Sequence, residues 1–387
     1  MAAQRFLHAK EDRRFRTRVS IDIPFLILLL LLLVVGLTML YSASYAQSEY
    51  DTGYVDSTRY LQKQGACAVI GLGAMVLLSR IPADFWLRTA WPLYGISIVL
   101  LLSVLLFGQS VNGARRWINI AGLQFQPSEI AKFTMIVLFA RLTKGFGQSA
   151  KEFRYGVLGF GGALLGILIP LALEKHLSAI MLMGMVAAVM MFVAGTNPKW
   201  LFAAAGAAVV FVVIYITFMG YAGDRVTAWL HPEQDPGDTG YQILQSLYAI
   251  GSGGLFGMGL GKSRQKYLYL PFQYNDYIFA IICEELGLIG ALLIVALFVA
   301  LILRGYWIAL RAPDRFSTVL AAGLITLIAV QTVLNLGVVT NLLPSTGIAL
   351  PFFSYGGTAL AVNLGEMGIL LSISRYRNHP AKQEGIE

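Results

Sequence analysis

The sequence predicts an all-α integral membrane protein, a bundle of about ten transmembrane helices with a large extracytoplasmic loop between helices 7 and 8. Hydrophobic residues fill 57% of the 387 positions and charged residues only 13%, and the mean hydropathy is +0.67. Soluble domains carry about 25% charged residues. Apolar runs recur along the chain, and about 20 apolar residues cross the ~30 Å hydrocarbon core of a bilayer.

The apolar runs predict one membrane domain at residues 23–373. A basic segment at 1–22 precedes it, and a C-terminal tail at 374–387 follows. The first run is interpreted as a retained helix, because no A-x-A cleavage pattern comes after it. The ten predicted spans lie at residues 23–40, 65–78, 89–107, 130–142, 156–173, 177–194, 200–219, 277–303, 319–339 and 358–373.

The basic residues predict the orientation of the bundle. With both termini in the cytoplasm, 19 of the 29 Lys and Arg residues fall on inner segments, as the positive-inside rule requires. The pI of about 9.4 therefore reflects this topology and contact with anionic lipid. No basic domain with interleaved aromatic residues is present, so we expect no nucleic acid partner.

Cysteine and histidine residues predict neither a disulfide nor a metal site. Cys67 and Cys283 lie inside apolar runs that are far apart in the sequence. The four histidines are scattered over different segments, without the spacing of metal ligands. The sequence indicates no cofactor, and it leaves open whether a divalent metal takes part.

Three carboxylates stand at the start of the eighth span. Asp276, Glu284 and Glu285 lie at the mouth and in the first turns of an apolar run that is long enough to cross a bilayer. An Asp at the centre of a spanning helix costs about 2.5–3.5 kcal/mol, so such residues normally face a wet cavity or a partner. The alternative is that Asp276 only caps a helix at the membrane edge.

Three polar loops converge on the outer side. The segment at 221–275 is long for a loop without function, and it contains an apolar-periodic piece at 241–250 and then a glycine-rich turn. The segments at 111–129 and 342–357 face the same side. We therefore expect a site at the outer membrane boundary, and nothing catalytic in the short basic cytoplasmic loops.

The glycine-rich turn at 257–263 ends like a nucleotide-binding loop. Its sequence, Gly-Met-Gly-Leu-Gly-Lys-Ser, fails the P-loop spacing because Phe256 stands where the first glycine is needed. We expect these glycines to permit close approach of the backbone.

Two pairs of charged residues have both an ordinary and a functional interpretation. Arg115 and Arg116 either anchor the chain at the interface or recognise phosphate, because guanidinium groups pair bidentately with phosphate oxygens. Glu129 and Lys132 share one helix face. They either neutralise each other, or Glu129 orients Lys132 toward a substrate.

Six motifs together resemble the SEDS family, which contains FtsW, RodA and SpoVE. The resemblance covers nearly the whole chain, and residues 245–251 and 263–267 are more similar to the FtsW and SpoVE branch. Two departures stand out: Tyr274 and Asn275 replace the usual His and Thr, and Glu174-Lys175-His176 replaces the more common Pro-Asp. The motifs lie at residues 112–118, 126–132, 240–246, 249–255, 276–287 and 350–357.

The resemblance implies a bacterial plasma-membrane peptidoglycan glycosyltransferase. Such an enzyme transfers the growing glycan from undecaprenyl pyrophosphate to a sugar hydroxyl of lipid II. It works beside a class B penicillin-binding protein and other division or sporulation membrane proteins. The essential carboxylate of the family corresponds to Asp276, which we assign as the general base because an acceptor hydroxyl must lose its proton.

The remaining candidate residues lie in or beside the matched motifs. We assign a structural or supporting role to Glu284, Glu285 and Glu366. The main rival function is a lipid II flippase, which would need polar access from both faces, and a third is a scaffold that only activates its partner. The candidate substrate-binding residues are Arg115, Arg116, Glu129, Lys132, Ser354, Tyr355 and Gly356.

Overall fold

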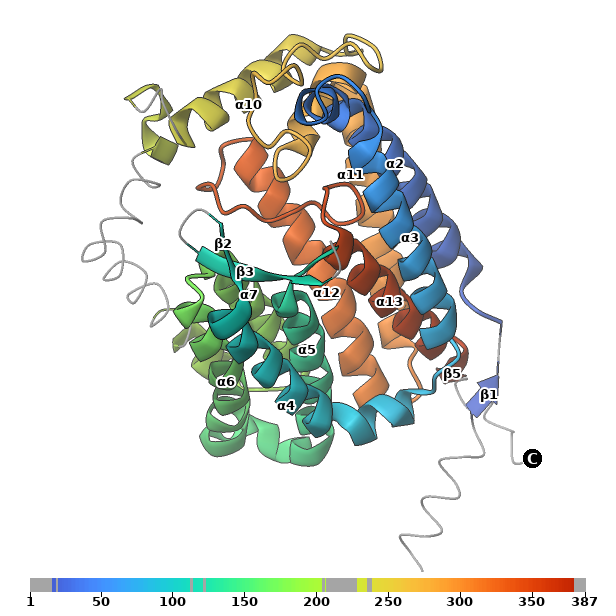
Figure 1. Ribbon diagram of the computed structural model, residues 1–387. Coiled ribbons are helices and arrows are strands. Elements are labelled where there is room, and N and C mark those ends of the chain that lie inside the picture. The colour runs from blue at the N-terminus through green and yellow to red at the C-terminus, as the bar shows by residue number, and fades with distance from the viewer. Residues whose placement is uncertain are drawn as a thin grey trace, which may run out of the picture.

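The computed structural model describes residues 16–18, 20–111, 114–120, 123–203, 206, 228–234 and 239–378. Long helices make up most of this part, and α10 lies across the upper end of the bundle (Figure 1). The long helices are α2 (Ile23–Asp51), α3 (Arg59–Leu78), α4 (Ala83–Phe107), α5 (Pro127–Phe146), α6 (Phe160–Leu173), α7 (Leu177–Val193), α10 (Thr239–Gly253), α11 (Ile278–Leu310), α12 (Arg315–Val339) and α13 (Gly357–Ser374).

The predicted fold class is confirmed. In the described residues, seven helical segments are long and apolar enough to cross a membrane, and the apolar α7 is slightly shorter. Nine of the ten predicted spans coincide with helices in the part of the chain that the structure describes. The seventh, at 200–219, lies largely outside the described residues. The chain is a multi-pass membrane protein.

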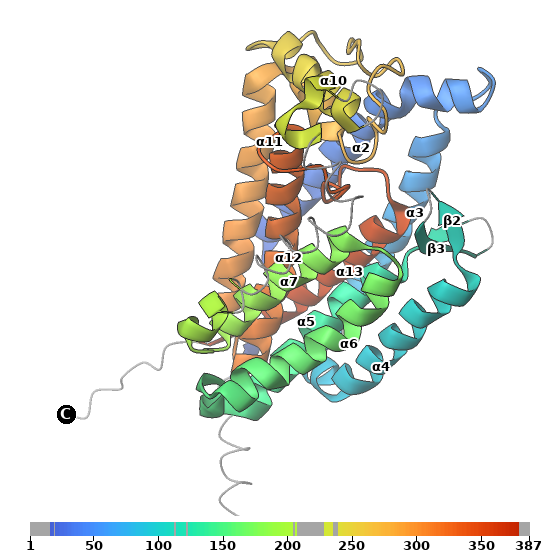
Figure 2. The ribbon, with the colours of Figure 1, turned by 90° about the vertical axis from the view of Figure 1, so that its left-hand side faces the viewer.

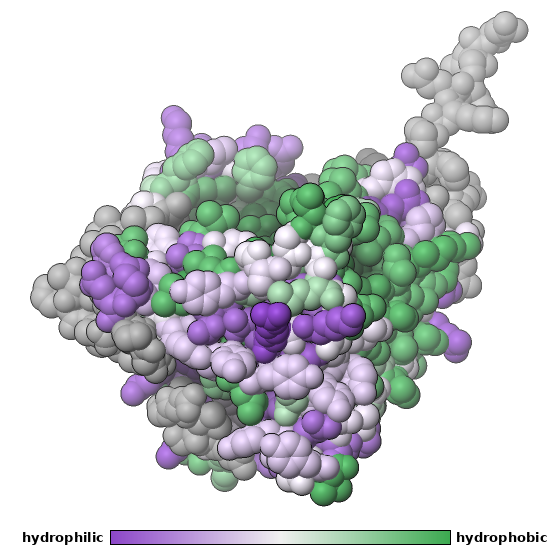
Figure 3. All heavy atoms as spheres, turned by 90° about the horizontal axis from the view of Figure 1, so that it is seen from above, coloured by the Kyte–Doolittle hydropathy of each residue, from purple (hydrophilic) through white to green (hydrophobic). Residues whose placement is uncertain are grey.

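Helices α12 and α13 form the centre of the bundle. In their most apolar windows 78% and 72% of the residues are buried, against 22–39% for the other candidate spans. The outer helices expose large apolar side chains, and Figure 3 shows an apolar flank beside the polar face at the upper end. Lipid covers such flanks. Polar residues on α12 and α13 therefore face protein, where they can build a site.

The two ends of the described chain meet at one end of the bundle. Strand β1 (Arg16–Arg18) pairs antiparallel with β5 (Tyr376–Asn378), at the lower right of Figure 1. Nearby, Arg304 on α11 donates two hydrogen bonds of 2.9 Å to the carboxylate of Asp22, which also caps α2. The two ends of the described chain thus lie on the same side of the bundle, and the predicted cytoplasmic location of the termini stays a prediction.

A small antiparallel sheet connects α4 and α5, where the sequence predicted only a loop. Its strands are β2 (Gln109–Val111), β3 (Ala114–Ile120) and β4 (Leu123–Phe125), in the order β2-β3-β4. It packs against α13, α4 and α5 near the middle of the bundle's height (Figures 1 and 2). The Thr358 hydroxyl at the start of α13 donates to the Gln124 carbonyl at 2.6 Å.

Helix α11 is broken at Gly287, so the predicted continuous span at 277–303 is corrected to two helical pieces. Gly287 has φ 68° and ψ −172°, a conformation open essentially only to glycine. The break frees the carbonyls of Glu284 and Glu285, which accept hydrogen bonds from Met258 N at 2.9 Å and Gly259 N at 3.0 Å. The glycine-rich turn thus packs directly on α11, and the expected close backbone approach is confirmed.

Replacing Gly287 should therefore destabilise the protein. In Gly287→Ala, a Cβ would lie 2.3 Å from Gly257 N and 2.6 Å from the Leu255 oxygen. The φ value alone costs about 1–3 kcal/mol for a residue with a side chain. We expect a clearly lower thermal unfolding temperature in detergent. The control is Gly73→Ala in α3, where a Cβ meets nothing within 4 Å; equal stability of the two variants would contradict the analysis.

Candidate active site

The chain around Asp276 is held by hydrogen bonds to its backbone. Asp276 is partly buried in the loop before α11. The Tyr274 carbonyl accepts from Tyr355 N at 2.9 Å, and the Asn275 carbonyl accepts from the Ser354 hydroxyl at 2.6 Å. Both donors belong to the loop between α12 and α13. This loop therefore fixes the two residues that precede the carboxylate.

A buried amide on α12 fixes Asp276 itself. Asn335 Nδ2 donates to the Asp276 carbonyl at 2.7 Å and to the Ile348 carbonyl at 2.8 Å, which uses both amide hydrogens. A Cβ at Gly347 would lie 3.3 Å from the Asp276 Oδ2 atom, and Gly347 has φ +68°. The Asp276 carboxylate thus passes close to a glycine backbone that leaves it room.

Helix α3 completes the support of these loops. Gln64 is buried, and its Nε2 donates to the Ser354 carbonyl at 3.1 Å while its Oε1 accepts from Gly356 N at 3.1 Å. The Ser354 hydroxyl also accepts from Leu350 N at 2.8 Å. Of the three residues predicted here to bind substrate, Ser354 and Gly356 use these groups to shape the loop. Tyr355 instead joins a cluster of aromatic rings.

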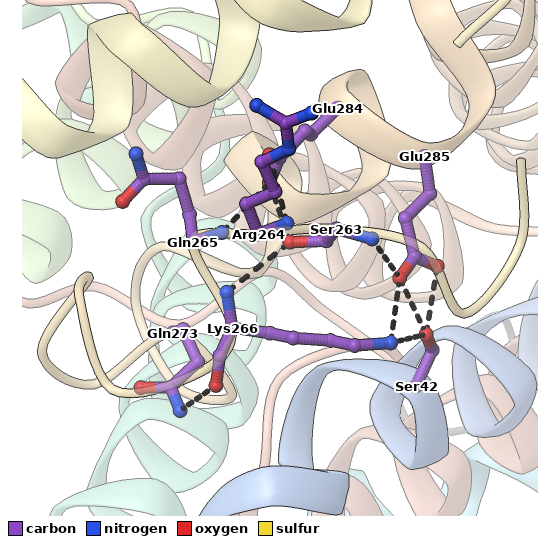
Figure 4. Close-up of polar contacts among 8 residues, drawn as sticks. All are labelled: Ser42, Ser263, Arg264, Gln265, Lys266, Gln273, Glu284 and Glu285. Atoms are coloured by element: carbon purple, nitrogen blue, oxygen red, sulfur yellow. Dashed lines mark hydrogen bonds and ion pairs between the residues drawn. The ribbon is translucent and has the colours of Figure 1, made fainter. Parts of the chain in front are cut away.

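Glu285 anchors the loop that leads to Asp276 (Figure 4). Its Oε1 lies 3.1 Å from Lys266 Nζ, and the two side chains are 0% and 3% exposed. The Ser42 hydroxyl of α2 lies 2.7 Å from both carboxylate oxygens, and Ser263 N donates to Oε1 at 3.3 Å. One buried ion pair therefore joins α2, α11 and the loop.

Glu284 binds the same loop from the neighbouring position. Its carboxylate accepts from the Ser263 hydroxyl, from Arg264 N at 3.0 Å and from Gln265 N at 3.3 Å. A carboxylate that accepts several backbone N–H groups is strongly held. Glu284 and Glu285 thus tie residues 263–266 to the first turns of α11, directly after Asp276.

A second polar group lies inside the bundle. Lys132 Nζ is 2.7 Å from Glu129 Oε2, with side chains 4% and 8% exposed. Glu366 on α13 is buried and close enough to interact electrostatically with both residues. Within the described chain, neither carboxylate oxygen of Glu366 has a hydrogen-bond partner, nor does Asn363 Oδ1 one turn earlier. Glu366 and Asn363 thus add unsatisfied acceptors to the buried polar space around Lys132.

The two arginines of β3 point to different neighbours. Adjacent residues of a strand face opposite sides. Arg116 Nη2 donates to the Lys175 carbonyl at 2.7 Å, whereas Arg115 is exposed and its Nη1 donates to the Leu105 carbonyl at 2.9 Å. The structure therefore brings Arg116, and not Arg115, to the connection between α6 and α7.

That connection carries two buried titratable groups. Burial raises the pKa of Glu174 to about 8, against the opposing effect of Arg116. Burial lowers the pKa of His176 to about 3, and Arg116 and Lys132 lower it further. His176 is therefore neutral at pH 7 and Glu174 is largely protonated. Neither adds much charge to the neighbourhood of Arg116, which keeps its positive character.

Several supporting residues were not predicted. Ser42, Gln64, Lys266 and Asn335 make the contacts described above, and three of them interrupt predicted or actual membrane helices. Polar residues within apolar runs are expensive and usually functional. That signal was available for Asn335, which lies inside a predicted span, whereas Gln64 stands just before one and nothing local in the sequence connects Lys266 with Glu285.

Breaking the Lys266–Glu285 pair should unfold the loop more easily. In Lys266→Met the Glu285 carboxylate loses its buried counter-ion, and removing one partner of such a pair costs about 3–5 kcal/mol. The double variant Lys266→Met with Glu285→Gln buries no charge and should recover part of the loss. Thermal unfolding in detergent measures both. The control is Lys262→Met, an exposed lysine of the same loop; a single-variant loss no larger than the control would refute the assignment.

Comparison with known proteins places this geometry in a family. Probable peptidoglycan glycosyltransferase FtsW of Geobacter sulfurreducens is 39% identical over 373 residues, 95% of this chain and 97% of that protein. Stage V sporulation protein E of Bacillus subtilis is 40% identical over 94% of this chain and 99% of that protein. A solved chain, from "Structural coordination of polymerization and crosslinking by a peptidoglycan synthase complex", aligns with TM-score 0.78 and 27% identity, over 92% of this chain and 98% of its own length.

The family model FTSW_RODA_SPOVE, described as "Cell cycle protein", matches residues 23–379. The match includes the whole described bundle and all six motifs singled out in the sequence. The two relatives carry names of the FtsW and SpoVE branch, which confirms the predicted branch. The chain therefore belongs to the FtsW, RodA and SpoVE family of membrane proteins.

Proposed function

We propose that this chain polymerises the glycan strands of peptidoglycan. It transfers the growing glycan from its undecaprenyl pyrophosphate carrier to a sugar hydroxyl of lipid II, with inversion at the anomeric carbon. The observation that carries the proposal is the immobilised carboxylate of Asp276, whose backbone carbonyl is held by Asn335. Relatives named peptidoglycan glycosyltransferase support the enzyme class.

Asp276 acts as the general base. It takes the proton from the acceptor hydroxyl while the hydroxyl oxygen attacks the anomeric carbon and the lipid pyrophosphate leaves. A positioned base contributes about 10²–10⁴-fold to such a step. The lipid pyrophosphate is a good leaving group, so the step needs little acid catalysis. Direct displacement forms no covalent intermediate, which accounts for inversion.

The cations near β3 hold the phosphates. Arg116 lies beside the connection between α6 and α7, and its guanidinium can pair bidentately with phosphate oxygens. Lys132 is different, because Glu129 already neutralises it at 2.7 Å. Arg115 of β3 is exposed, and its guanidinium bonds the last turn of α4. We therefore assign Arg116 the main contact with pyrophosphate, and Arg115 and Lys132 weaker ones.

The proposed setting is the bacterial plasma membrane, with both termini in the cytoplasm and Asp276 on the extracytoplasmic side. Polar residues gather on the face of the bundle seen from above (Figure 3). The proposed partner is a class B penicillin-binding protein, with other division or sporulation membrane proteins. The solved chain from a peptidoglycan synthase complex supports a partner of this kind.

A lipid II flippase is the alternative. It would need a polar route through the bundle, and the buried polar group around Glu129, Lys132 and Glu366 is the feature that favours it. The names of the relatives favour the glycosyltransferase. The experiment on Asp276 separates the two functions.

Asp276→Asn should abolish polymerisation and keep the fold. The amide preserves the volume of the side chain, and Asn335 holds this residue through its backbone carbonyl, which the substitution keeps. Purified protein, oriented in proteoliposomes with lipid II only on the outward leaflet, should form glycan strands in the wild type and none in the variant. Glu233→Gln, a 64% exposed carboxylate of the same large loop, serves as the control.

Near wild-type strand length from Asp276→Asn would refute the base assignment. The flippase would be established instead by two results together. The wild type makes no polymer even with a penicillin-binding partner, and it moves labelled lipid II between leaflets in a way that depends on Asp276.

Arg116→Gln should weaken use of the lipid pyrophosphate substrate more than Arg115→Gln does. We expect a rise in KM of about tenfold for Arg116→Gln, since charged hydrogen bonds contribute about 1.5–3 kcal/mol, with little change in unfolding temperature. Lys132→Gln should lower stability as well, because it leaves Glu129 buried without its partner. Lys63→Gln, an exposed cation of α3, is the control. Equal KM changes for both arginine variants would contradict this assignment.

A further inference from the structure

Three tyrosines from separate segments meet next to Asp276. Tyr60 comes from the start of α3, Tyr274 stands two residues before Asp276, and Tyr355 belongs to the loop before α13. The ring centroids of Tyr60 and Tyr274 are 4.5 Å apart, those of Tyr60 and Tyr355 4.9 Å, and those of Tyr274 and Tyr355 5.9 Å. All three side chains are partly exposed, so a ligand can reach their rings.

The tyrosine cluster is fixed to the backbone of the site. Tyr355 N donates to the Tyr274 carbonyl at 2.9 Å, and Gln64, one turn after Tyr60 on α3, holds the loop of Tyr355 through Ser354. A ring that shifts relative to Asp276 would have to break these hydrogen bonds. The cluster is therefore a rigid surface at a fixed distance from the proposed base.

A series of hydrogen bonds orients the hydroxyl groups of Tyr60 and Tyr274. Tyr60 Oη donates to Asp51 Oδ2 at 2.5 Å, and Gln47 Nε2 holds the other Asp51 oxygen at 2.9 Å. A carboxylate only accepts, and a phenol has one proton to donate. In the 3.3 Å contact between Tyr60 Oη and Tyr274 Oη, Tyr274 must therefore be the donor. Its oxygen keeps a lone pair for a ligand that donates.

We infer that Tyr60, Tyr274 and Tyr355 form a sugar-binding subsite for the acceptor. A pyranose ring has an apolar face that packs on aromatic rings, and its hydroxyl and amide groups donate hydrogen bonds. The rings supply the apolar contact, Tyr274 Oη accepts from a sugar hydroxyl or acetamido N–H, and the neighbouring Asp276 receives the proton of the attacking hydroxyl. This inference rests on the proposed function, because it names the acceptor of that reaction.

The tests use variants that separate ring from hydroxyl. Tyr274→Leu removes the ring, and Tyr274→Phe keeps the ring and removes the acceptor oxygen. Tyr41→Leu removes a ring from a separate aromatic pair, Tyr41 and Tyr45 on α2. Asp276→Asn leaves the tyrosines intact. Each full-length variant is purified in detergent, and its unfolding temperature is recorded.

Binding is measured without the reaction. The probe is the soluble disaccharide of N-acetylglucosamine and N-acetylmuramic acid, followed by saturation-transfer NMR. We expect the wild type, Asp276→Asn and Tyr41→Leu to bind it alike, and Tyr274→Leu to bind at least about tenfold more weakly, since tenfold corresponds to 1.4 kcal/mol. Wild-type binding in Tyr274→Leu, or no binding of the disaccharide by the wild type, would overturn the subsite.

Kinetics supply the second readout, which decides the matter where Tyr274→Leu does not fold. Tyr274→Phe should raise KM for the acceptor about threefold to tenfold, as expected for one hydrogen bond, with kcat nearly unchanged. An unchanged KM, or a loss confined to unfolding temperature, would mean that the cluster only joins α3 to the loops. The disaccharide could also bind in a tyrosine-dependent way to a protein that makes no polymer. That result would support the subsite and contradict the proposed reaction.

Discussion

A single side-chain amide in the interior of the bundle sets the position of the proposed base. Asn335 donates to the carbonyls of Asp276 and Ile348, and so joins the loop before α11 to the loop before α13. Inside a membrane bundle no bulk water competes for these carbonyls, and losing a buried partner costs about 1–3 kcal/mol. Asn335 thereby fixes the proposed base through its backbone carbonyl.

The second constraint is the buried charge at the start of α11. Two unlike charges inside protein are stable only when their geometry is complete, so Lys266 must reach Glu285 before the loop can settle. The break at Gly287 helps to hold this loop. It frees carbonyls that would otherwise bond within the helix, and these carbonyls accept hydrogen bonds from the turn at 257–259. Loop, helix break and ion pair therefore support one another, and Asp276 lies between the loop and the first turns of α11 that they join.

The sequence predicted the spans well because the bilayer leaves so little choice: a segment must be long, apolar and helical. It could not reveal the break at Gly287, because glycine is common inside membrane helices and the apolar run continues after it. The sheet at β2–β4 had a usable signal in Asn112-Gly113, a pair typical of tight hairpins. The tyrosine cluster had none, because Tyr60 and Tyr274 lie 214 residues apart.

The arrangement of the helices divides the proposed work between two halves of the bundle. Figure 1 shows α4 to α7 on one side and α2, α3 and α11 on the other, with α12 between them. The first half, with β3, carries Arg116 and Lys132, whereas the second carries Tyr60 and the Lys266–Glu285 pair. In this proposal the first side holds the glycosyl donor by its phosphates, and the second side holds the acceptor sugar on aromatic rings. The two substrates meet at Asp276, which Asn335 of α12 holds in place. Base and acceptor are then fixed by the same central helix, and catalysis by proximity needs that common reference.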